Sequence, residues 1–195
     1  MQDTVARYEF RVFGDDFSDI EKTIQNNFRF MQSKESSEIY ILSDKTLINN
    51  CKIRYDLLDI KQLIAHHDDL EQWIPKLKVS FPISRQVISY EIFKYLCIDI
   101  ADLQYPHYYY TDFIEKIIKP HPDLKIINIR KFREAYAVND CMIEIARVEL
   151  NNKSLTTIGI ESAYPPQIMH NRNLLGLNDY QNENYVVALK RLTDL

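Results

Sequence analysis

The stretch Asn50–Lys61, NCKIRYDLLDIK, consists of two short segments in which charged and apolar residues alternate. With the period of two that a β-strand imposes, Lys52 and Arg54 point to one side and Ile53 points to the other. After a tight reversal near Leu57, the second segment repeats this arrangement. Two adjacent strands are therefore predicted, each with one apolar face and one charged face.

The same alternation recurs along the chain and predicts eight strands. Besides the two segments above, they are expected at Val5–Phe13, Glu38–Ser43, Lys76–Phe81, Leu124–Ala137, Cys141–Leu150 and Ser154–Ser162. Most connections between these strands have the length of a hairpin turn, which predicts an antiparallel sheet. Eight strands are enough to close a barrel or to form a strongly curved sheet.

Helices are expected at three places, which makes the chain an α+β protein. Asp16 is predicted to cap a helix at Phe17–Asn27, and a helical insert is expected over residues 84–119, after the fifth strand. A last helix is expected at Glu183–Leu192. The other segments are expected to be a polar loop at Gln32–Ser37, a short helix through Glu71–Trp73 that Asp68 caps, and a polar connector after Pro165-Pro166.

Length and composition indicate one domain over residues 1–195, with 46% hydrophobic residues and no low-complexity run. The N-terminal residues lack the layout of a signal peptide, and no apolar run approaches the length of a membrane span. The three cysteines are odd in number and widely spaced, so they predict no zinc site and no disulfide framework, and a cytoplasmic protein is expected. The net charge of −4 argues against broad nucleic-acid binding, although a local basic cavity would escape that argument.

The charged faces of the predicted strands carry an excess of positive charge. They hold nine of the 24 basic residues but only four of the 28 acidic residues. The basic residues are Arg7, Arg11, Lys52, Arg54, Lys61, Lys76, Lys78, Lys131 and Arg133, and the acidic ones are Glu9, Asp59, Glu144 and Glu161. Rows of cations on neighbouring strands repel one another unless an anion lies among them. A polyphosphate with a divalent metal ion would suit such a surface, because cations bind its oxygens and carboxylates hold the metal.

Several segments together resemble the CYTH superfamily of triphosphate tunnel enzymes, which includes class IV adenylyl cyclases, thiamine and inorganic triphosphatases, and RNA triphosphatases of the fungal and viral type. The similarity covers nearly the whole chain. Its carriers are, in order, RYEFRVFG, KIR, LDIK, IRKFREAY, MIEIARVEL, TIGIES and NYVVALKRL. The resemblance implies an eight-stranded antiparallel tunnel that binds a triphosphate-containing substrate and uses Mg²⁺ or Mn²⁺.

The resemblance also implies roles for individual residues. Glu9 and Arg11 match the second acid and the base of the family's Glu-x-Glu-x-Lys signature. Arg7, however, replaces the first acid, and Gly159 lies near the end of the last strand, where the family often has paired glutamates. By this resemblance Glu9, Glu144 and Glu161 are the metal ligands, and Lys52, Arg54, Lys61, Lys131 and Arg133 match phosphate-clamping positions. Taken together with the charged strand faces, it predicts substrate binding by Arg7, Lys52, Arg54, Lys76, Lys78, Lys131 and Arg133, and catalytic roles for Lys61 and Arg11.

Three hypotheses follow from these observations. The first is a metal-dependent phosphohydrolase that acts on inorganic, thiamine or nucleoside triphosphate, or a related adenylyl-cyclase-like enzyme. The second is a weakly active or non-catalytic module that binds polyphosphate, a nucleotide or an RNA 5′ end in the same tunnel; the two departures at Arg7 and Gly159 motivate it. The third is a sheet that serves as a platform for protein contacts and whose charges are merely solvated.

Overall fold

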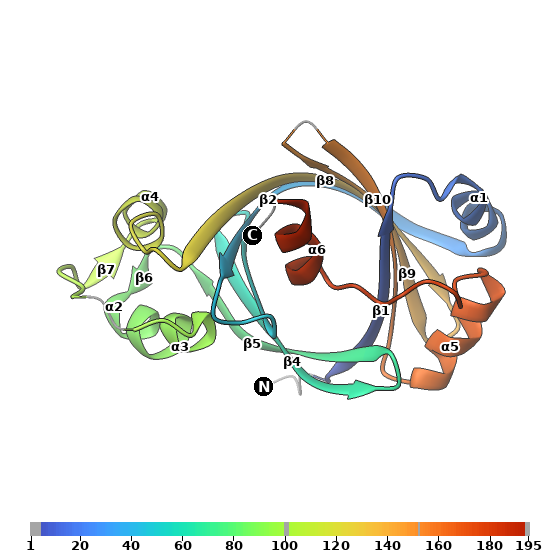
Figure 1. Ribbon diagram of the computed structural model, residues 1–195, viewed down its shortest axis with the longest axis horizontal. Helices are drawn as coiled ribbons and strands as arrows, with labels where there is room; N and C mark the ends of the chain where they lie inside the picture. Colours follow the sequence, from blue (N-terminus) through green and yellow to red (C-terminus); the bar gives the residue numbers. More distant parts are fainter. Residues whose placement is uncertain (1–4, 100–101, 152, 194–195) are drawn as a thin grey trace. The chain divides into compact units, whose positions relative to one another are not determined.

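The structure is a computed structural model that describes residues 5–99, 102–151 and 153–193 (Figure 1). Its large strands are β1 (Arg7–Gly14), β2 (Arg29–Ser43), β3 (Asn49–Arg54), β4 (Leu57–His67), β5 (Leu70–Ser80), β8 (Leu124–Val138), β9 (Cys141–Leu150) and β10 (Lys153–Ser162). Its helices are α1 (Ser18–Asn27), α2 (Arg85–Val87), α3 (Phe93–Leu96), α4 (Tyr110–Phe113), α5 (Pro165–Leu174) and α6 (Tyr185–Leu192), with π-helical turns η1 (Ile88–Ile92) and η2 (Ile114–Ile118).

The eight large strands form a closed antiparallel barrel in the order β1-β10-β9-β8-β2-β3-β4-β5. Two short strands, β6 (Ile83–Ser84) and β7 (His107–Tyr108), make a separate small sheet within the helical insert. The α+β class, the eight-stranded antiparallel barrel and the insert after the fifth strand are therefore confirmed. The described helices include none that is both long enough and apolar enough to cross a membrane.

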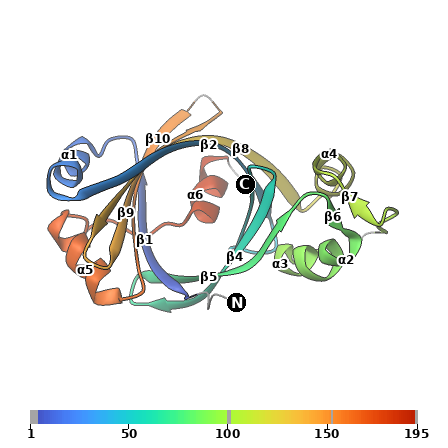
Figure 2. The same cartoon turned by 180° about the vertical axis from the view of Figure 1, so that it is seen from behind.

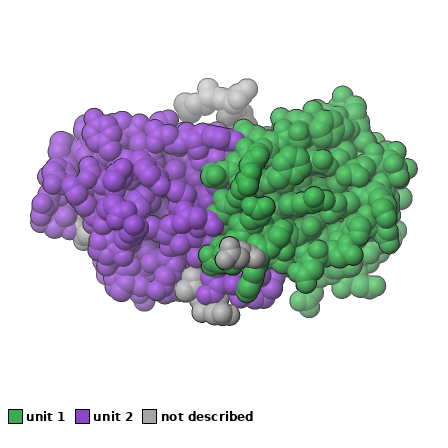
Figure 3. Space-filling model, turned by 90° about the horizontal axis from the view of Figure 1, so that it is seen from above, with its two compact units in different colours: residues 1–37, 63–74, 129–184 green, residues 38–62, 75–128, 185–195 purple. Residues whose placement is uncertain are grey.

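Contacts divide the chain into two compact units (Figure 3). Unit 1 takes the described residues of Met1–Ser37, Leu63–Ile74 and Ile129–Asn184. Unit 2 takes those of Glu38–Gln62, Pro75–Asn128 and Tyr185–Leu195. Each unit has its own hydrophobic core.

In unit 1, helices α1 and α5 lie beside β1, β9 and β10 in both ribbon views (Figure 1 and Figure 2). Phe10 and Val12 of β1 belong to one buried cluster together with Ile24 of α1 and Ile168 of α5. We call the face of these strands that the two helices cover the outer face. Because side chains alternate along a strand, Glu9 and Arg11 point to the opposite, inner face.

In unit 2, the helices of the insert cover the outer face of β3 and β4. Ile53 and Ile60 pack there with Ile88, Phe93 and Phe113 in a second buried cluster. The inner face of β2 is covered differently. The ring of Tyr185, at the start of α6, stacks on the ring of Tyr40 with their centroids 5.7 Å apart. The predicted last helix is thus confirmed, and it packs on the charged side of the sheet.

Three predictions for the segments between the strands are wrong. Gln32–Ser37 continues strand β2 instead of forming a loop; most of its side chains are exposed, so the segment shows no apolar alternation. Glu71–Trp73 lies in β5, and Asp68 stands in the β4–β5 turn with a φ of 54°. Residues that cap helices also favour such turns, so the sequence signal was ambiguous.

The third wrong prediction is the polar connector after Pro165-Pro166, because Pro165–Leu174 forms α5. Proline is well tolerated in the first turn of a helix, where its missing N–H would have no intrahelical partner. The buried positions of α5 are Ile168, Asn171 and Arg172. Two of the three are polar, and this explains why no apolar helical period was visible in the sequence.

The two-residue turn between β3 and β4 gives a first testable prediction. Tyr55 and Asp56 both have positive φ values, 52° and 59°, as a type I′ hairpin turn requires. Glycine adopts this conformation without strain, so Asp56→Gly is expected to raise the free energy of unfolding by about 0.5 kcal/mol in urea melts. Asp59→Gly, placed inside β4, is the control and should lower it. A loss of stability in both variants would contradict the turn assignment.

Candidate functional site

The register of β1, β10 and β9 brings the predicted site residues of unit 1 onto one inner face. Arg11 lies opposite Gly159, which in turn lies opposite Glu144. Glu9 lies opposite Glu161 by the same ladder. This register therefore places the charged residues of β1, β9 and β10 on the same face of the sheet.

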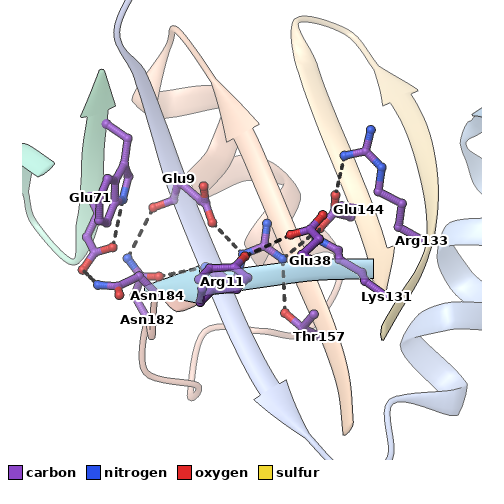
Figure 4. A network of polar contacts seen from close by, with 12 residues as sticks. Glu9, Arg11, Glu38, Glu71, Lys131, Arg133, Glu144, Thr157, Asn182 and Asn184 are labelled. Atoms are coloured by element: carbon purple, nitrogen blue, oxygen red, sulfur yellow. Dashed lines mark hydrogen bonds and ion pairs between the residues drawn. The ribbon is translucent and has the colours of Figure 1, made fainter. Parts of the chain in front are cut away.

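Three cations of unit 1 converge on the carboxylate of Glu144 (Figure 4). Oε1 of Glu144 is 2.8 Å from Nζ of Lys131 and 3.1 Å from Nη1 of Arg11. Its other oxygen, Oε2, is 3.1 Å from Nη1 of Arg133. The side chains come from β1, β8 and β9, and Glu144 itself is 5% exposed. Both of its oxygens thus accept charge-assisted hydrogen bonds.

The charge of Glu144 is held by its neighbours. Burial by itself would raise the pKa of this carboxyl, but Lys131, Arg11 and Arg133 outweigh burial and hold the pKa well below its ordinary value. Glu144 is therefore an anion at neutral pH. A buried carboxylate with three cationic partners is stable only as long as these partners stay in place.

Arg11 is the most connected cation of this cluster, and it is 3% exposed. Its Nε donates to Glu9 at 2.6 Å, and its Nη1 donates to Thr157 Oγ1 at 3.2 Å as well as to Glu144. The departure from the family pattern at Gly159 has a local reason. A Cβ atom at Gly159 would lie 2.5 Å from Nη2 of Arg11, so the guanidinium occupies the place of a side chain.

Unit 2 contains a smaller arrangement of the same kind. Glu38 of β2 is 1% exposed, and its Oε1 is 3.0 Å from Nη1 of Arg54. Its Oε2 is 3.7 Å from Nζ of Lys52. Tyr40, two residues along the strand, donates its hydroxyl to the same carboxylate at 3.3 Å. Two predicted cations thus contact a buried acid in this unit as well.

Comparison with solved structures gives the same architecture. HpAC1 from Hippeastrum, described as a candidate adenylyl cyclase with a dominant triphosphatase activity, matches with a TM-score of 0.57 and 13% identity over 97% of each chain. The PH1012 protein of Pyrococcus horikoshii matches with a TM-score of 0.52 and 18% identity, over 94% of this chain and 98% of its own. A conserved hypothetical protein of Pyrococcus furiosus has a TM-score of 0.51 and 18% identity, over 93% and 97%.

The chain has a CYTH-like barrel fold. The similarity to these structures is one of fold, because the identities are low. No family model matches the sequence, and no curated protein matches it either.

Not every cation predicted for the site takes part in these clusters. Arg7, Lys76 and Lys78 are exposed, and Lys61 is half-buried. Within the described part of the chain, none of these four forms a salt bridge. Glu161 is half-buried on β10. Their roles in ligand binding, catalysis or metal binding stay predictions.

Several polar residues of the barrel were not predicted from the sequence. Glu38 was assigned to a strand but not to its charged face, although its alternation with Ile39 and Ile41 would have placed it opposite these apolar residues. Thr157 reads as an ordinary strand residue. Asn182 and Asn184 lie in the connector before α6, where no periodic signal exists.

The connector is nevertheless part of the site's support in unit 1. The backbone N–H of Arg11 donates to Asn182 Oδ1 at 2.8 Å, and the backbone oxygen of Arg11 accepts from the N–H of Glu183 at 2.8 Å. Asn184 donates to Glu71 at 2.8 Å, beside the donor Nε1 of Trp73. Burial raises the pKa of Glu71, and these two donors partly oppose the shift. The connector thus holds Arg11 where β1 no longer pairs with β5.

The predicted metal ligands do not form a suitable donor set for a divalent ion. Glu9 and Glu144 already accept hydrogen bonds from cations. Among residues 5–99, 102–151 and 153–193, no group of three or more His, Cys, Asp or Glu side chains is arranged to hold a metal. A cation approaching Glu144 would also be repelled by the three positive charges around it. The Mg²⁺ or Mn²⁺ site stays a prediction.

The contact between Gly159 and Arg11 gives a second prediction. Gly159→Ala should push the guanidinium out of its contacts and lower the free energy of unfolding by about 1–3 kcal/mol in urea melts. In an Arg11→Met background the same change should cost much less, because the obstructing guanidinium is gone. Equal costs in both backgrounds would show that the guanidinium does not occupy this place.

Proposed function

We propose that this chain binds the triphosphate part of an anionic ligand on the inner-face cations of its barrel. The candidates are inorganic triphosphate, thiamine triphosphate, a nucleoside triphosphate and an RNA 5′ end. The observation that supports the proposal is the convergence of Arg11, Lys131 and Arg133 on one small anionic group, each within 3.1 Å of it. Donors that hold a carboxylate in this way are also suited to a phosphate group.

Hydrolysis of the bound triphosphate is the second candidate function. It is favoured by the similarity to HpAC1, which is described as having a dominant triphosphatase activity. In this proposal Lys61 and Arg11 offset the charge that develops in the transition state. The cationic contacts of Glu9 and Glu144 oppose it, and so binding is the first proposal and hydrolysis the second.

Calorimetric titration of tripolyphosphate tests both candidates. The titration is carried out in EDTA and again in Mg²⁺ or Mn²⁺, and free phosphate is measured in the same samples. Binding of tripolyphosphate in EDTA is the expected result. Release of phosphate only in the metal buffers would support the hydrolase. Absence of binding in all buffers would overturn the proposal.

A further inference from the structure

The carboxylate of Glu144 occupies the position to which the cations of unit 1 point. Arg11 and Lys131 both contact Oε1, while Arg133 contacts Oε2. The three cations carry more positive charge than this single carboxylate neutralises. Glu9, which pairs with Arg11 at 2.6 Å, is a second acid beside this cluster. Three cationic side chains thus meet at one small anionic group, an arrangement that also suits a phosphate group.

Arg133 has a donor that no acceptor of the described chain satisfies. Its Nε is buried and has no hydrogen-bond partner in the part of the chain that the structure describes. A buried donor without an acceptor costs free energy, so the structure favours an acceptor there. A phosphate offers more oxygens than a carboxylate, and it can accept from two nitrogens of one guanidinium.

From these contacts we infer that Glu144 is a built-in counter-anion that the ligand's phosphate group displaces from Arg11, Lys131 and Arg133. The inference rests on the proposed binding function and deepens it. Glu144 sets the affinity by competing with the ligand instead of contributing a metal ligand. Only a polyanion that gains several charge-assisted contacts at once can displace it, so the site selects tripolyphosphate over monophosphate or acetate.

The test compares the wild-type protein with Glu144→Gln by titration of tripolyphosphate in EDTA. Glutamine keeps the shape and one acceptor oxygen but removes the competing charge. The variant is expected to bind tripolyphosphate about 10- to 100-fold more tightly, which corresponds to the loss of one charged competitor. The matched control is Glu149→Gln, an exposed acid on the same strand with opposite parity, which should leave the affinity unchanged.

The opposite result would identify a metal ligand. If Glu144→Gln bound tripolyphosphate more weakly than the wild type, and only in Mg²⁺ or Mn²⁺, the inference would be overturned. Equal affinity of variant and wild type in EDTA would also overturn it. Binding by neither protein would instead refute the proposed function itself, so the two failures are distinguishable.

Glu144→Gln takes one shared counter-charge from three buried or half-buried cations, and the single variant can fail to fold for that reason. The double variant Lys131→Met/Glu144→Gln removes one charge of each sign and keeps the balance. It is compared with Lys131→Met alone. Tighter binding of tripolyphosphate in EDTA by the double variant supports the displacement of Glu144, and equal or weaker binding contradicts it.

Discussion

Arg11→Met is expected to lower the free energy of unfolding by about 3–5 kcal/mol, measured by urea denaturation at pH 7. Arg11 is buried and contacts Glu9, Glu144 and Thr157. Methionine can fill much of its volume but cannot donate a hydrogen bond. The change leaves buried carboxylates with less positive charge, which is among the most destabilising changes in a protein interior.

Two further variants test whether the loss of stability comes from the lost positive charge or from the lost contacts of the Arg11 guanidinium. Arg7→Met, on the same strand and face, removes an exposed cation without a salt bridge in the described chain and should change stability by less than about 0.5 kcal/mol. Arg11→Lys keeps the charge but loses the planar fork, so its stability should lie between those of Arg11→Met and the wild type. A small effect of Arg11→Met would mean that the cluster contributes little to folding.

Lys131→Met is expected to weaken tripolyphosphate binding about 10- to 100-fold in calorimetric titration. Lys131 is 5% exposed, and its Nζ lies 2.8 Å from the carboxylate that we expect the ligand to replace. A hydrogen bond between charged groups contributes about 1.5–3 kcal/mol, and a factor of ten in affinity corresponds to about 1.4 kcal/mol. The lost affinity should therefore be measurable at moderate salt.

The control for Lys131→Met is Lys22→Met, which removes an exposed lysine from α1 in the same unit. Lys22 pairs with Asp19 at 3.4 Å, and a surface pair of this kind contributes little. Its loss should leave tripolyphosphate affinity within a factor of two to three, a range that follows from a net-charge effect alone. A similar loss in both lysine variants would mean that binding depends on overall charge instead of on the inner-face cluster.

The strands of the barrel could be predicted from the sequence because apolar and charged residues alternate along most of them. In β1, β3, β9 and β10, one face must be apolar to pack under helices, and the other carries charge. The prediction failed where the environment did not constrain the side chains in this way. The first half of β2 is exposed, and α5 buries Asn171 and Arg172, so neither segment shows the period of its secondary structure.

The candidate site was predictable in part for the same reason. Parity placed Arg11 and Glu144 on charged faces, and the register of β1, β10 and β9 shows that these faces coincide in unit 1. No sequence pattern could show which oppositely charged residues touch. That depends on how far each strand is shifted against its neighbour, and a shift of a single residue exchanges the two faces.

The sequence by itself thus determined the strand-rich chain, its helical insert and the set of charged residues available to a ligand. Only the tertiary structure decided that Glu144 is enclosed by three cations and that the guanidinium of Arg11 fills the space above Gly159. The physical reason is that alternation is a local property of each strand, whereas contact between charges depends on strand register and on burial, which lowers the local dielectric and strengthens each ion pair.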